Sequence, residues 1–189
     1  MGVLAALLGL AACRAETAKG NAPRPTASAV GTTAWAPLEG RELIGTSAPE
    51  LRDLVFVQGG PLSLAQLEGK LVLIRFWLMD CPYCRATAPA LNELHRRYEA
   101  RGLVVLGIHH PKSKASRDLE HVRRTARELG FEFPVAHDDA WTTARAFGVG
   151  STFKRFTSVT LLVDREGKIA WVHDGGEFHA GGGAGHEAC

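Results

Sequence analysis

Two cysteines separated by two residues follow a long apolar run. Residues 71–77 have the length and composition of a strand that is covered on both faces. The motif Cys81-Pro82-Tyr83-Cys84 comes shortly after this run, and a segment with helical periodicity comes next. A cysteine that opens a helix lies near unpaired backbone N–H groups and the positive end of the helix dipole, which stabilise its thiolate. The order predicts a strand, a redox-active dithiol and a helix in one unit.

The same cysteine spacing occurs in zinc sites, which need a second pair of ligands at suitable spacing. The sequence contains four cysteines but no second Cys-x-x-Cys motif. Pro82 also suits the first turn of a helix. The motif therefore favours redox chemistry over a structural metal site.

Length and composition predict one medium-sized domain with a proper core, since the chain has 189 residues and 46% of them are hydrophobic. The formal net charge of +2 is too small to indicate a nucleic-acid partner. We expect the domain over residues 41–175, followed by a Gly- and His-rich tail over residues 176–189.

The first residues are typical of an export signal. Residues 1–12 are an uncharged apolar stretch, and Leu10-Ala11-Ala12-Cys13 resembles the cleavage motif of bacterial lipoproteins. No Lys or Arg precedes the stretch, so a buried N-terminal helix with an incidental cysteine is the alternative. Residues 13–40 are rich in small and turn-forming residues and predict a flexible tether. We expect a lipid on Cys13 to tether an exported domain to a membrane, where disulfide chemistry is common.

The order of apolar runs, amphipathic segments and turn residues in residues 41–175 predicts a mixed α/β sheet with parallel crossovers, an antiparallel edge hairpin and helices on both faces. The expected strands are residues 54–57, 71–77, 103–108 and 131–135, with a hairpin of residues 159–164 and 168–173. The expected helices are residues 86–101, 117–129 and 141–147.

Short motifs spread over this region resemble the thioredoxin superfamily, specifically its TlpA/ResA-type redoxin branch, which is related to the AhpC/TSA proteins. The matching segments, in chain order, are residues 45–51, 67–70, 76–77, 81–85, 89–91, 133–135, 146–149 and 162–169. The resemblance implies a thioredoxin-like fold and a thiol–disulfide oxidoreductase. It assigns Cys81 as the attacking cysteine and Cys84 as the resolving one, with Trp77, Pro82 and Tyr83 around them.

Family members exchange disulfides with exported proteins in the periplasm or cell envelope, and the resemblance favours reduction. The implied partners are exported protein disulfides and a thiol reductant or oxidant, and no cofactor is expected. In the chemistry, a Cys81 thiolate attacks a partner disulfide and Cys84 then displaces the partner.

Two charged residues depart from the family pattern. Asp80 precedes the attacking cysteine, where its carboxylate opposes thiolate formation unless it points to solvent. Arg75 replaces a buried carboxylate that many thioredoxins carry six residues before the first cysteine. If it is buried, it needs a carboxylate partner such as Asp80 or Glu177, and near the dithiol it would favour the thiolate. The alternative is that Arg75 faces solvent.

Ser158 falls where the family has a cis-proline that packs against the dithiol. A non-proline cis peptide bond is costly, so we expect a trans bond here. The change would alter how substrate docks, or leave the sulfurs open to a metal or a peroxide.

Other functions remain open. A peroxiredoxin-like peroxidase would have Pro and Thr where the chain has Ile74 and Leu78, and a glutaredoxin would have a Thr-Val-Pro loop. A copper- or zinc-binding lipoprotein is a further alternative, and its candidate ligands are His173, Glu177, His179, His186 and Cys189 in the tail region and His109 and His110. We expect His109 and His110 to be loop residues that cap a groove.

The tail leaves two further questions. We expect the final helix of the family fold to be missing after residue 175. Cys189 is left over once Cys13, Cys81 and Cys84 are assigned, and is either a third redox thiol or a solvated bystander.

Overall fold

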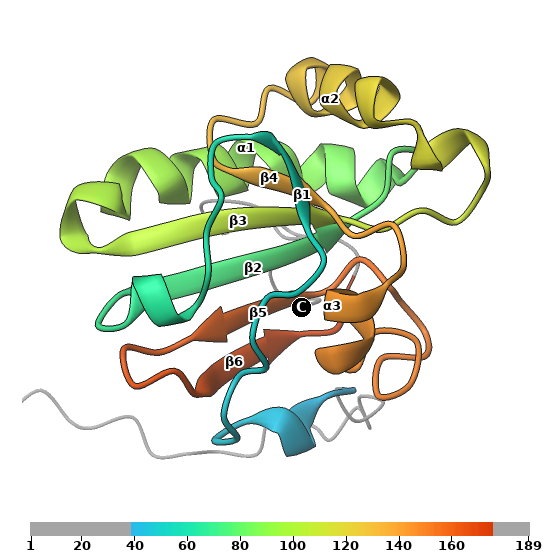
Figure 1. Ribbon diagram of the computed structural model, residues 1–189. Helices are drawn as coiled ribbons and strands as arrows, with labels where there is room; N and C mark the ends of the chain where they lie inside the picture. Colours follow the sequence, from blue (N-terminus) through green and yellow to red (C-terminus); the bar gives the residue numbers. More distant parts are fainter. Residues whose placement is uncertain (1–38, 176–189) are drawn as a thin grey trace, which may run out of the picture. The chain divides into compact units, whose positions relative to one another are not determined.

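The computed structural model describes residues 39–175 and forms a six-stranded sheet with three α-helices in these residues (Figure 1). The strands are β1 (Val55–Gln58), β2 (Leu71–Trp77), β3 (Leu103–His109), β4 (Val135–His137), β5 (Thr160–Val163) and β6 (Ile169–His173). The helices are α1 (Pro82–Tyr98), α2 (Leu119–Glu128) and α3 (Thr142–Ala146), and short 3₁₀ turns lie at Arg41–Leu43, Ala65–Leu67, Glu99–Arg101 and Ala115–Arg117.

The sheet has the strand order β1-β4-β3-β2-β5-β6. Strands β2, β3 and β4 are parallel, whereas β1 pairs antiparallel with β4 and β5 pairs antiparallel with β2. The β5–β6 hairpin forms one edge, which confirms the predicted combination of parallel crossovers and an edge hairpin. Because β2 is the central strand between β3 and β5, both of its edges are paired and the residues that follow it are held firmly.

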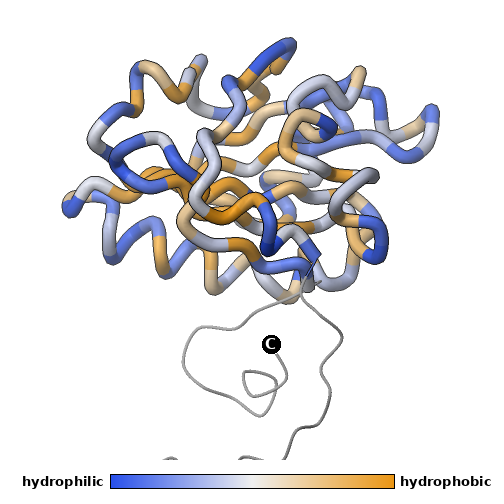
Figure 2. Tube along the Cα trace, turned by 90° about the horizontal axis from the view of Figure 1, so that it is seen from below, coloured by the Kyte–Doolittle hydropathy of each residue, from blue (hydrophilic) through white to orange (hydrophobic). Residues whose placement is uncertain are grey.

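Helices cover both faces of the sheet, as expected. The crossovers through α1 and α2 step in the same direction across the sheet, so right-handed connections put both helices on one face. That face has a core built from Leu73, Val105, Ala88, Leu91, Val122 and Ala126. The other face packs α3 and the N-terminal segments against Ile74, Phe76, Phe147, Phe153 and Leu161. In Figure 2 the hydrophobic residues lie mainly in the interior of the domain and the hydrophilic ones mainly at its periphery.

Two predicted starts were wrong by four residues, and the other boundaries differ by three residues or fewer. The helix begins at Pro82 instead of residue 86, so the dithiol motif belongs to its first turn. The strand expected at residues 131–135 lies at Val135–His137, and Phe131 and Phe133 are buried in the loop before it. Gln58 explains the shift, because its side-chain amide donates to the carbonyls of Phe131 and Phe133, both at 2.8 Å, in place of a strand partner.

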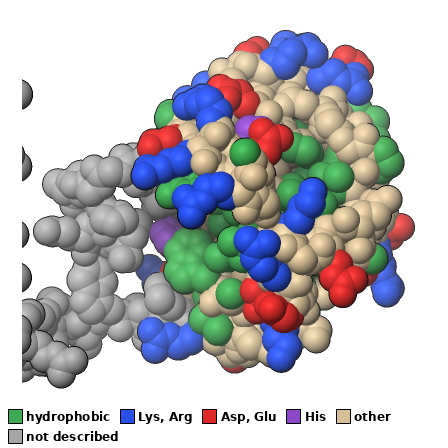
Figure 3. All heavy atoms as spheres, turned by 90° about the vertical axis from the view of Figure 1, so that its left-hand side faces the viewer, with side chains coloured by type: hydrophobic (Ala, Val, Ile, Leu, Met, Phe, Trp, Pro, Cys, Tyr) green, Lys and Arg blue, Asp and Glu red, His purple; other side chains and the backbone are tan. Residues whose placement is uncertain are grey.

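The surface of the described region carries mixed charge. On the face in Figure 3, Lys and Arg side chains are interspersed with Asp and Glu. Within residues 39–175 no helix has the length and apolar character needed to cross a bilayer. The predicted signal, the lipid site Cys13, most of the tether, the region after residue 175 that bears on the final helix, and the tail residues Glu177, His179, His186 and Cys189 lie outside the described residues.

Candidate active site

The dithiol lies where the central strand passes into α1. Strand β2 ends at Trp77, and Cys81 is the N-cap of the helix, with Pro82 in the first turn. The Cys81 sulfur accepts a hydrogen bond from the backbone N–H of Cys84 at 3.2 Å. Cys81 is half-buried and Cys84 is buried, and both are free thiols. One sulfur is therefore accessible to a partner and the other is protected behind it.

The two thiols have opposite acidity. The pKa of Cys81 is lowered to about 6, first by a hydrogen bond from the Cys84 thiol, and also by the Cys84 N–H, a hydrogen bond from Ser158 and the charge of Arg75. Burial opposes this shift. The pKa of Cys84 is raised, because its thiol donates a hydrogen bond to Cys81 and because the side chain is buried. At neutral pH the pair is a Cys81 thiolate beside a Cys84 thiol.

Arg75 lies directly beneath the dithiol. Leu73, Arg75 and Trp77 alternate along β2 and share the face that α1 covers. The Arg75 side chain is 1% exposed, so the solvent-facing orientation is wrong. Its Nη1 donates to Thr160 Oγ1 at 3.0 Å, and its Nη2 lies 3.8 Å from Cys84 Sγ. Burial lowers the pKa of Arg75, and its attraction to Cys84 and Cys81 opposes that shift.

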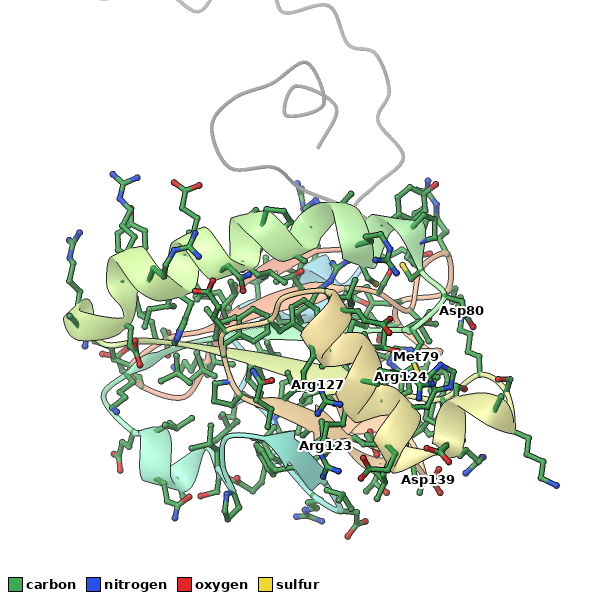
Figure 4. All side chains as sticks on the ribbon, turned by 90° about the horizontal axis from the view of Figure 1, so that it is seen from above. Met79, Asp80, Arg123, Arg124, Arg127 and Asp139 are labelled. Carbon is green, nitrogen blue, oxygen red and sulfur yellow. The ribbon has the colours of Figure 1, made fainter. Side chains whose placement is uncertain are left out.

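The other two departures from the family pattern also have defined positions. Ser158 is buried and hydrogen-bonds Cys81. Its preceding peptide bond is trans, since the cis bond found in residues 39–175 is Gly60–Pro61. Asp80 is exposed and lies at the periphery of the molecule (Figure 4). Its carboxylate therefore has the solvent-facing orientation, the alternative in which it acts only weakly on Cys81. Ser158 therefore acts on the dithiol directly, whereas the Asp80 carboxylate is solvated.

Aromatic residues border the dithiol on two sides. Trp77 is fully buried and lies edge-on to His109 and Phe131, with ring centroids 4.9 and 5.2 Å away. Tyr83 is 44% exposed, and its ring meets Phe156 edge-on at 6.2 Å. Sequence reasoning missed Phe156 and Thr160. Their closeness in sequence to Ser158 was the available signal, because the loop before β5 was already expected to face the sulfurs.

His109 and His110 are fully buried, which corrects the expectation that they cap a groove from a loop. His109 Nδ1 lies 2.9 Å from Nδ1 of His137 on the neighbouring strand. Burial lowers the pKa of both His109 and His110 to about 3, so they are neutral at physiological pH. Among residues 39–175, no group of three or more His, Cys, Asp or Glu side chains is placed to hold a metal ion.

The mixed sheet and the dithiol at the start of α1 define the class of the protein, a thioredoxin-like redoxin. The model of the AhpC/TSA family matches residues 44–172, and the chain belongs to this family.

Similarity to known proteins supports a TlpA/ResA-like redoxin. The chain is 30% identical over 118 residues to Protein DipZ of Mycobacterium bovis, a match that covers 61% of this chain and 16% of DipZ. It is 28% identical over 120 residues to the thiol-disulfide oxidoreductase ResA of Halalkalibacterium halodurans, covering 64% of this chain and 62% of ResA. The chain thus spans less than two thirds of either relative.

Solved structures show the same fold. A thiol-disulfide isomerase from Corynebacterium glutamicum superposes with a TM-score of 0.57 and 27% identity, over 67% of this chain and 85% of that one.

Proposed function

We propose that the protein catalyses thiol–disulfide exchange with exported proteins through Cys81 and Cys84. One observation carries the proposal: a half-buried Cys81 sulfur with a pKa of about 6 lies beside a buried Cys84 thiol. A thiolate that is accessible at neutral pH can attack a partner disulfide, and a protected second thiol can release the partner. The names of the ResA relatives support the same activity.

Exchange needs two displacements. The Cys81 thiolate attacks one sulfur of the partner disulfide, whose S–S bond breaks, and the second partner sulfur leaves as a thiolate. Cys84 then attacks the Cys81 sulfur, and its proton passes to the departing partner thiolate. The partner gains two electrons and the Cys81–Cys84 disulfide forms. Each displacement is reversible, and the family resemblance favours this reducing direction.

The cellular setting is proposed with the activity. The signal-like residues 1–12 and the lipoprotein motif at Cys13 support a domain anchored by lipid in the cell envelope. The partners would be exported proteins and a thiol reductant or oxidant of the same compartment, since protein disulfides persist in such compartments.

A trapping experiment tests activity and location together. In cells that express the full chain, Cys84→Ser should accumulate mixed disulfides through Cys81, because the resolving thiol is gone. The complexes should be recovered from the envelope fraction. Cys81→Ser is the matched control and should trap none of them. Trapping by Cys81→Ser would overturn the assigned roles, and recovery from the cytosol would contradict export. Rapid peroxide consumption by the purified protein would support the peroxidase alternative instead.

A further inference from the structure

The loop that carries Ser158 is held by contacts from outside it. Residues 154–159 form neither helix nor strand, and no proline restricts their backbone. At one end the carbonyl of Val159 accepts a hydrogen bond from the N–H of Phe76 on β2 at 2.9 Å. At the other end Phe153 is fully buried in the core on the α3 side of the sheet. The position of the Ser158 hydroxyl therefore depends on what fixes the residues between these ends.

A carboxylate from a distant part of the chain fixes the first of these residues. One oxygen of Glu39, Oε2, accepts hydrogen bonds from the backbone N–H groups of Lys154 and Arg155 at 2.7 and 3.0 Å. The Glu39 backbone N–H donates in turn to Asp174 Oδ2 at 2.8 Å, directly after β6. Hydrogen bonds from N–H groups to a charged carboxylate are stronger than those between neutral groups. Glu39 thus links the end of the hairpin to the start of the loop.

Gly40 allows the same segment to pack closely against the residue before the loop. Its φ is +83°, and a Cβ atom at this position would clash with the ring of Phe153. Glycine meets both requirements, because it adopts a positive φ without strain and has no side chain. Residues 39 and 40 therefore hold Phe153 and the two residues after it.

The other end of the loop reaches the dithiol. The Arg155 guanidinium lies over the Phe156 ring, 5.6 Å from its centroid, and that ring meets Tyr83 edge-on at 6.2 Å. Two residues further on, Ser158 is buried and hydrogen-bonds Cys81. A continuous set of contacts therefore leads from the anchored backbone to the attacking sulfur.

We propose that Glu39 is a positioning residue of the exchange site and that it holds the loop so that the Ser158 hydroxyl donates to the Cys81 sulfur. This inference rests on the proposed thiol–disulfide exchange and adds to it a residue far from the dithiol in sequence. Without the carboxylate, the two N–H groups bond to water and the loop also samples positions in which the Ser158 donor is absent. The thiolate then loses part of its stabilisation, whereas the sheet and both cores keep the domain folded.

A thiolate titration tests the inference. The ultraviolet absorbance of the reduced full chain is followed against pH, and the titration of Cys81→Ser is subtracted so that the other cysteines do not contribute. We expect Glu39→Ala to raise the pKa of Cys81 by about half a unit, somewhat less than the loss of one whole hydrogen bond would give. Glu39→Gln keeps an oxygen that can accept from both N–H groups and should stay close to wild type. Glu42→Ala is the matched control, because this exposed carboxylate lies in the adjacent 3₁₀ turn.

The sign of the shift separates positioning from a direct effect of charge. A carboxylate near a thiol disfavours the thiolate, so loss of the Glu39 charge alone would lower the pKa of Cys81. Loss of the Ser158 donor raises it. An unchanged or lowered pKa in Glu39→Ala would therefore overturn the inference, and so would a Glu39→Gln variant that behaves like Glu39→Ala.

A double-mutant cycle shows whether Glu39 acts through Ser158. In the Ser158→Ala background the donor is already absent, so the addition of Glu39→Ala should cause no further rise in the pKa of Cys81. Equal shifts in both backgrounds would mean that Glu39 acts by another route and would overturn the inference. An unshifted titration in Ser158→Ala alone would also overturn it, because no donor would then need to be positioned.

The titration needs no partner, so the two proposals fail in different ways. If the wild-type chain exchanges with neither glutathione disulfide nor insulin disulfides, the proposed function is wrong and the inference falls with it. Exchange combined with an unshifted titration in Glu39→Ala overturns the inference alone. If Glu39→Ala does not fold by circular dichroism, Asp174→Ala replaces it. That variant removes the acceptor of the Glu39 N–H and should raise the pKa of Cys81 by a smaller amount, and no rise would overturn the inference.

Discussion

The dithiol centre (Arg75, Cys81, Cys84 and Ser158) and the histidine cluster (His109, His110 and His137) lie close to each other in the sheet. Strands β2 and β3 are parallel neighbours, and Trp77 at the end of β2 pairs with His109 at the end of β3. Both groups place titratable side chains in the protein interior. Their charge states nevertheless differ.

The difference lies in what compensates burial. In the histidine cluster burial is the first cause of the lowered pKa of each residue, and neighbouring positive charge adds to it at His109 and His110. In the dithiol centre burial also opposes ionisation, but donors and Arg75 outweigh it at Cys81. A buried charge persists where hydrogen bonds and an opposite charge replace water. The reactive anion is therefore confined to the start of α1, and the histidines serve packing.

Lowering the pH should destabilise the folded protein through protonation of the histidine cluster. His109 and His110 have folded pKa values of about 3, whereas unfolded histidine titrates near 6.5. Below pH 6.5 the unfolded chain binds more protons, so stability is present above that pH and is lost as pH falls towards 3. We expect the free energy of unfolding to be roughly 4 kcal/mol lower at pH 5 than at pH 7.5, measured by urea denaturation. His110→Gln should lose about half of this pH dependence, and an equal slope in both proteins would contradict the account.

The sequence predicted the dithiol better than its surroundings. The apolar run of β2 and the motif after it are local signals, so their positions were predictable. The burial of Arg75 stayed one of two alternatives, because its partner Thr160 is 85 residues away and pairs with it only in the folded sheet. The histidine cluster was missed for a related reason. His109 and His137 end different strands, and only the register between β3 and β4 brings them together.

Removing His109 separates packing from chemistry. Its ring is fully buried between Trp77 and His137, so His109→Ala leaves a cavity in the core. We expect the free energy of unfolding to fall by about 2–3 kcal/mol, while the exchange rate per folded molecule stays within a few-fold. Cys81→Ser should do the reverse, with exchange lost and stability nearly unchanged. A large loss of exchange in stably folded His109→Ala would give the histidine cluster a chemical role.

Ser158 gives the smallest and most specific change at the dithiol centre. Its hydroxyl hydrogen-bonds Cys81 and helps to lower the pKa of that sulfur. Ser158→Ala removes the donor without a large change in volume. A net hydrogen-bond energy of about 1 kcal/mol corresponds to a rise of about 0.7 of a pKa unit. The pKa is read from the ultraviolet absorbance of the thiolate during a pH titration. Ser158→Thr keeps a hydroxyl and should stay close to wild type. An unshifted titration in Ser158→Ala would mean that Cys84 and Arg75 suffice to hold the thiolate, and that the residue in the proline position does not tune it.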